Sequence, residues 1–101
     1  MTRPVGTHAA VEAVWRIESA RLVAGLARFV GDLGLAEELA QDALVAALEQ
    51  WPAEGVPANP GGWLMSTAKH RAIDQLRRRQ NYQRKLTEVG RMLEQQPFDQ
   101  P

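Results

Sequence analysis

The sequence predicts an all-α domain of three helices, or of four if the chain beyond Arg79 forms a helix of its own. Three stretches repeat apolar residues at intervals of three and four, the periodicity of a helix with one buried face. Segments rich in glycine or proline lie between these stretches and are expected to form the turns. With 101 residues, of which 45% are hydrophobic, the chain can form one packed core.

The first helix is predicted from Ala9 to Val30. Its core-facing residues are expected to be Val11, Val14, Trp15, Leu22, Leu26, Phe29 and Val30. Gly31 and Gly34 follow, and they supply the backbone freedom that a tight turn between helices needs. So short a link favours an antiparallel pair with the next helix.

The second helix is predicted from Leu35 to Trp51, where Pro52 is expected to stop it. Its apolar stripe consists of Ala36, Leu39, Ala40, Ala43, Leu44, Ala47, Leu48 and Trp51. The opposite face carries Glu38, Gln41, Asp42, Val45 and Glu49. Val45 is either a stray exposed residue or the apolar centre of an acidic docking patch for a basic partner helix.

The third helix is expected to follow a loop over Pro52–Gly62. Asn59 is predicted to cap it and Pro60 to occupy its first position, and the helix runs to about Arg79. The inner stripe is expected to contain Leu64, Met65, Ala68, Ala72 and Leu76, with Ile73 at the margin. Helical spacing continues at Tyr82, Leu86, Val89 and Leu93, which either extend this helix or form a short fourth one.

Charge is unevenly distributed along a chain whose formal net charge is zero. Residues 1–62 hold four arginines against eight acidic residues, whereas residues 63–91 hold eight basic residues against two acidic ones. Such segregation suggests two partners of opposite character, with the basic half a candidate nucleic-acid surface. The alternative is a solvated basic helix face without a ligand.

One face of the third helix combines aromatic and basic side chains. Trp63, His70 and Arg77 are seven residues apart and therefore lie along one line. This composition suits the stacking of unpaired bases and the binding of their phosphates. The alternatives are that Trp63 packs under the loop and that His70 forms a hydrogen bond with Asp74.

Several classes of function are disfavoured. Without cysteine the chain cannot form disulfides or thiolate metal sites. It contains no apolar run of about 20 residues and no N-terminal signal segment, so a cytoplasmic protein without a membrane partner is expected. No nucleophile motif accompanies the two histidines, so we expect no enzyme, no cofactor and no metal site.

Two stretches resemble region 2 of bacterial sigma factors. Glu38-Leu39-Ala40-Gln41-Asp42, continuing to Trp51, is similar to the acidic D-L-x-Q-E…A-W stretch of that region. Residues 63–78, WLMSTAKHRAIDQLRR, resemble the W-L-x-x-I-A-x-N-x-A-I-D-x-L-R-R signature of the extracytoplasmic-function class. The resemblance covers Val11 to Arg79. It implies a flexible N-terminus over residues 1–8, a sigma region 2 bundle over 9–80, and over 81–101 the start of an interdomain linker that is partly helical or disordered.

The resemblance also implies a function and its residues. The residues expected to dock on the clamp helices of the polymerase β′ subunit are Glu38, Gln41, Asp42, Val45 and Glu49. The residues expected to recognise the non-template strand of the promoter −10 element and to help melt it are Asn59, Trp63, Ser66, Lys69, His70, Arg77 and Arg78. The sequence leaves open whether an anti-sigma factor also binds. The alternative function is a helical protein-interaction domain that does not bind nucleic acid.

The chain departs from the family pattern at three positions and in length. His70 stands where asparagine is usual, Thr67 where an apolar residue is usual, and Asp42 where glutamate is commoner. The exchange at His70 bears on which −10 base is preferred. A second, helix-turn-helix domain does not fit within 101 residues, so a fragment holding region 2 is expected.

Overall fold

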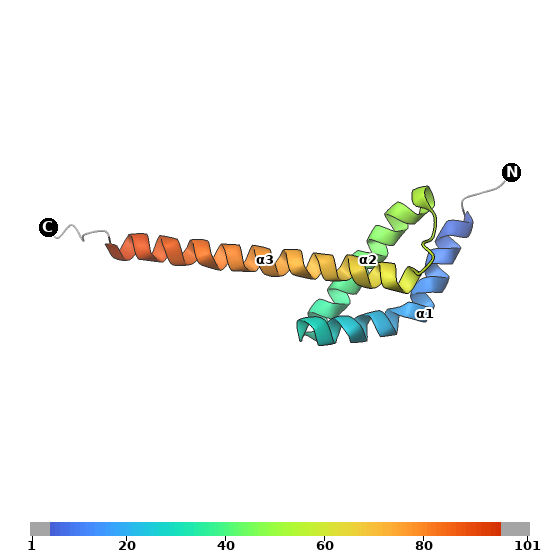
Figure 1. Ribbon diagram of the computed structural model, residues 1–101, viewed down its shortest axis with the longest axis horizontal. Helices are drawn as coiled ribbons and strands as arrows, with labels where there is room; N and C mark the ends of the chain where they lie inside the picture. The colour runs from blue at the N-terminus through green and yellow to red at the C-terminus, as the bar shows by residue number, and fades with distance from the viewer. Residues whose placement is uncertain (1–4, 96–101) are drawn as a thin grey trace.

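The computed structural model describes residues 5–95, and within that range it consists of three helices (Figure 1). These are α1 (Val5–Val30), α2 (Leu33–Glu54) and α3 (Pro60–Gln95). The first two helices and the start of α3 form a packed body, and the rest of α3 projects away from it (Figure 1). The all-α, three-helix prediction is confirmed. No helix in the described range is long and apolar enough to cross a membrane.

The turn between α1 and α2 is tight, as predicted. Gly31 has a φ of 73°, and its N–H donates to the carbonyl of Ala27 at 2.8 Å, which ends α1. Asp32 then caps α2, since its side chain accepts a hydrogen bond from the N–H of Leu35 at 3.1 Å. Because of this cap, which was not predicted, α2 begins at Leu33, two residues earlier than expected.

The predicted flexible N-terminus over residues 1–8 is wrong in part. The helix α1 begins at Val5, so residues 5–8 are helical and His8 is exposed on the surface of α1. Residues 1–4 lie outside the described range.

Pro52 does not stop α2, contrary to prediction. A proline lacks only its own N–H, and so close to the end of a helix it removes a single bond. The helix continues to Glu54 and ends where Gly55, with a φ of 89°, donates its N–H to the carbonyl of Trp51 at 2.7 Å. The connecting loop is therefore shorter than expected and spans residues 55–59.

The start of α3 matches the prediction, but its end does not. The side-chain oxygen of Asn59 accepts the N–H of Gly62 at 3.1 Å, and its carbonyl accepts the N–H of Trp63 at 3.0 Å. The helix does not end at Arg79 but runs unbroken to Gln95, so the alternative of an extended third helix is confirmed. The part of the predicted linker over residues 81–95 is helical, and residues 96–101 lie outside the described range.

The core lies between the three helices and is rich in alanine. Its buried residues are Val11, Leu22, Leu26, Ala36, Leu39, Ala40, Ala43, Ala46, Ala47, Trp51, Leu64, Ala68 and Ala72. Three predicted core residues are wrong: Leu48 is 36% exposed, Leu76 is 44% exposed and Phe29 is 47% exposed. Leu76 belongs to the stretch of α3 that leaves the body, and Phe29 lies in the last turn of α1, beside a surface hollow.

Alanine at two glycines should have opposite effects on stability. Gly31→Ala forces a side chain into a left-handed conformation and should cost about 1 kcal/mol of unfolding free energy, although nothing lies within 4 Å of the added atom. Gly90→Ala, in the helical part of α3 with equally open surroundings, should stabilise the local helix by up to about 1 kcal/mol. Urea unfolding measures the first change, and amide hydrogen exchange over residues 82–95 measures the second. Equal signs for the two would contradict this account.

Candidate nucleic-acid and protein interfaces

Four of the five predicted docking residues are exposed together on α2. Glu38, Gln41, Val45 and Glu49 lie on one exposed side of the helix, and Val45 is 51% exposed. We call these four residues the acidic face. Its apolar centre is Val45, whose side chain cannot form hydrogen bonds with water. Valine is β-branched, so its helical propensity does not favour it at this position either. The arrangement suits a partner helix that brings both cations and apolar side chains.

The fifth docking residue, Asp42, lies at the border of the acidic face. It is half-buried and lines a small hollow between α2 and α3. The other residues of this hollow are Arg71, Asp74, Gln75 and Arg78. Arg78, which was predicted to bind DNA, therefore lies near the Asp42 carboxylate of α2, on a different side of α3 from Arg77. Asp42 connects the acidic face to the basic side chains of α3.

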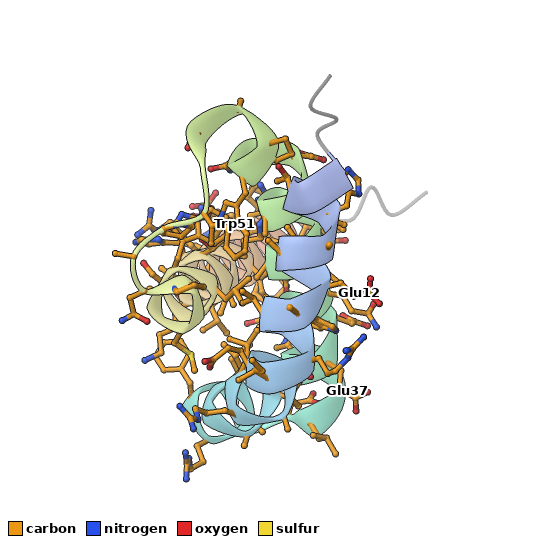
Figure 2. All side chains as sticks on the ribbon, turned by 90° about the vertical axis from the view of Figure 1, so that its right-hand side faces the viewer. Glu12, Glu37 and Trp51 are labelled. Carbon is orange, nitrogen blue, oxygen red and sulfur yellow. The ribbon has the colours of Figure 1, made fainter. Side chains whose placement is uncertain are left out.

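The predicted role of Trp63 in stacking a base is not supported by its position. Its ring packs against that of Trp51, with centroids 5.3 Å apart and planes at 67°, an edge-to-face pair. The side chain is half-buried against the core. Figure 2 places the labelled Trp51 in the middle of the body, where the helices converge. The alternative reading, in which Trp63 packs beneath the loop, describes its position better.

The side chain of Asn59 has a structural task in this protein. Its oxygen is occupied by the cap on Gly62, which positions the first turn of α3. The amide nitrogen of Asn59 is the group that could donate a hydrogen bond to DNA.

A shallow apolar hollow gathers three of the predicted DNA-binding residues. It measures ≈ 500 Å³ and is lined by Phe29, Gly62, Met65, Ser66, Lys69, His70 and Ile73. The ammonium of Lys69 lies 5.0 Å from the centroid of the Phe29 ring, a cation–π contact. We call this apolar hollow the Phe29 hollow. An aromatic wall with a cationic and an imidazole rim is a setting that can hold a flat ring and an adjacent phosphate.

Phe29 is the residue of this site that the sequence analysis missed. Helical periodicity assigned it to the core, because it follows Leu22 and Leu26 at regular spacing. The available signal was its place in the last turn before Gly31, where a helix often extends past its neighbours.

Basic side chains continue along α3 from the hollow. Arg77, Arg84 and Arg91 are exposed and spaced by seven residues, so they form a row about 10 Å apart along the helix axis. We call this the arginine row. His70 precedes it at the same interval, and among the described residues it forms no hydrogen bond with Asp74. The predicted line of Trp63, His70 and Arg77 therefore continues to Arg84 and Arg91, although the ring of Trp63 packs against Trp51.

Comparison with known proteins identifies a family pattern in this region. The pattern of Sigma-70 region 2 matches residues 17–82. An uncharacterized protein of Rhizobium meliloti (strain 1021) is 42% identical over 53 residues, which is 52% of this chain. The match spans only 12% of that relative's length. No solved structure matches the chain significantly.

Substitution of Trp63 should affect stability before it affects any ligand. Trp63→Ala removes the half-buried ring beside Trp51 and should lower the unfolding free energy by about 2 kcal/mol. Trp63→Phe keeps an aromatic ring there and should cost less than about 1 kcal/mol. Urea denaturation followed by circular dichroism measures both. A fully stable Trp63→Ala protein would show that the ring does not support the start of α3.

Proposed function

Because the chain belongs to the sigma-70 region 2 family, we propose that it is the region 2 domain of an extracytoplasmic-function sigma factor. It docks on the β′ clamp helices of RNA polymerase in the cytoplasm, and recognises and helps to melt the promoter −10 element. The family acts in transcription initiation and is not enzymatic. The observation that carries the proposal is the separation of the acidic face on α2 from the Phe29 hollow and the arginine row on α3.

Docking on polymerase rests on the acidic face and on Asp42. Three of these side chains carry carboxylates, and the exposed Val45 lies between them. A basic helix with an apolar residue at its centre would bury Val45 while its cations meet Glu38 and Glu49. Charge complementarity of this kind sets the orientation and association rate of a complex more than its affinity.

Binding of the opened strand rests on the Phe29 hollow. An unpaired base can enter the hollow against Phe29, while Lys69 and His70 at the rim meet its phosphate and its edge. Extruding a base from a duplex costs a few kcal/mol, and a pocket that receives the base recovers part of that cost. The hollow therefore favours the melted state without any covalent chemistry.

The arginine row supplies contacts that do not depend on sequence. Guanidinium groups bind phosphate oxygens and displace the counterions condensed on DNA, so each contact makes binding more sensitive to salt. The row runs on from the hollow along one helix, and it would hold the backbone of the DNA next to the captured base.

The second candidate function is a helical protein-interaction domain without nucleic-acid binding. The acidic face alone would support it. The two functions differ in the response of single-strand binding to salt, because only a phosphate-binding surface loses affinity steeply as salt rises.

Charge reversal of Asp42 should disrupt polymerase binding. Asp42→Arg places a cation beside Arg71 and Arg78 and should weaken binding to core polymerase by more than about tenfold. The matched control is Glu37→Arg on the same helix, since Glu37 lines a hollow with Ala20 of α1 and points away from the body (Figure 2). Pulldown with core enzyme, with circular dichroism to verify the fold, measures the effect. Equal binding by the two variants removes the docking assignment.

Loss of the aromatic ring at Phe29 should weaken single-strand binding. Phe29→Leu keeps an apolar side chain but removes the stacking surface, and the affinity for a −10 oligonucleotide should fall by about tenfold. Tyr82→Leu is the control, because this exposed aromatic lies on the projecting part of α3, outside the hollow.

His70→Ala should weaken binding to the −10 oligonucleotide more than to a scrambled one. Fluorescence anisotropy measures all three, and equal losses for Phe29→Leu and Tyr82→Leu would exclude the hollow as a base site.

A further inference from the structure

The apolar stripe that packs α3 onto the body continues along the projecting part of the helix. Leu64, Ala68 and Ala72 are buried, and the same line of the helix reaches four further apolar side chains after Gln75 and Arg79. We call these four the projecting stripe: Tyr82, Leu86, Val89 and Leu93. Their four-three-four spacing confines them to one narrow strip. They are 63%, 53%, 52% and 62% exposed, so no other part of the described chain covers them.

The shape of the projecting stripe fits another helix. Two apolar residues per seven is the pattern of a seam between two helices, and the four residues extend over about 16 Å. Gly90 lies beside the stripe, where it lets a partner backbone come close. Helices that lie on a membrane surface have a broader apolar face, usually with Trp or Phe, and residues 76–95 contain neither.

The charges beside the stripe indicate an acidic partner. Arg78 and Lys85 lie along one edge of the stripe and Arg79 precedes it on the same line of the helix, whereas Glu88 lies on the far side. Residues 76–95 hold six basic side chains against two acidic ones. A second copy of the chain fits poorly. In a parallel pair the Arg79 side chains of the two copies would meet, and in an antiparallel pair the edge with Arg78 and Lys85 would face the same edge of the other copy.

We propose that the projecting stripe is the docking surface for an acidic amphipathic helix of a partner protein. The inference goes beyond the proposed role in transcription, since the four apolar residues that carry it lie on a different face of α3 from the Phe29 hollow and the arginine row. The arginine row lies on the side opposite the stripe, so a helix bound there leaves the arginines open to phosphate. One helix can therefore hold a protein on one side and nucleic acid on the other.

A synthetic peptide tests this surface directly. The probe is a labelled helical peptide of about four heptads with Leu at its seam and Glu along both edges, and its control has Lys in place of Glu. Fluorescence anisotropy with the full chain should show the Glu peptide binding at least about tenfold more tightly than the Lys peptide. The double variant Leu86→Gln/Val89→Gln should lose at least about tenfold in affinity for it. The matched control is Arg84→Gln/Arg91→Gln on the opposite side of the helix. In salt high enough to screen the general attraction between the basic chain and the acidic peptide, this variant should bind the Glu peptide as tightly as the unchanged chain does.

A charge exchange keeps the test valid if the glutamine variant loses helix content. Arg79→Glu/Lys85→Glu should reverse the preference, so that the Lys peptide binds more tightly than the Glu peptide, and it leaves Arg78 beside Asp42 unchanged. Sedimentation of the unchanged chain should show a monomer, and anionic vesicles should not bind it through Leu86 and Val89. Equal binding of the two peptides, a stable dimer that Leu86→Gln/Val89→Gln dissociates, or vesicle binding lost in that variant would each overturn the proposal.

Discussion

The contact between Trp51 and Trp63 is the interaction on which the rest of the structure depends. Trp51 is only 2% exposed, and its ring fixes the first turn of α3 against α2. Asn59 caps the same turn, so both the position and the start of α3 are set within a few residues. The indole N–H of Trp51 has no hydrogen-bond partner among the described residues, so the contact between the two indole rings rests on packing. Because α3 is one unbroken helix, its direction at Trp63 determines where every later side chain lies.

The core explains why so small a body can hold so long a helix. Seven of its thirteen buried residues are alanine, which lets the helices approach closely but buries little area per residue. The large, fully buried side chains are few: Leu26, Leu39, Leu64 and Trp51. Stability is therefore concentrated in these few positions. The surface residues of α2 and α3 are correspondingly free to serve binding, since none of the charged side chains in the described range is buried.

Periodicity predicted the helices well because each has a buried face, but it could not predict where the neighbours of a helix end. Phe29 and Leu76 keep the correct spacing and are nevertheless exposed, since spacing describes one helix and burial depends on another. The length of α3 was left open for the same reason: beyond Arg79 no other part of residues 5–95 packs against the helix to strengthen the pattern. The helix α2 continues past Pro52 because a proline so near the helix end removes only one hydrogen bond. The site was predicted in composition, through Ser66, Lys69 and His70, whereas its aromatic wall came from a residue distant in sequence.

The charge division seen along the sequence becomes a division between faces. Residues 63–91 were expected to form one basic surface, yet on α3 the basic side chains lie on several sides of the helix. Arg71 and Arg78 turn toward Asp42 on α2, and the arginine row continues from the Phe29 hollow on the other side. A ligand that approaches along α3 therefore meets only part of the positive charge. The remainder adjoins the acidic face, where it lowers the local negative potential near Asp42 and leaves Glu38 and Glu49 as the carboxylates most available to a basic partner.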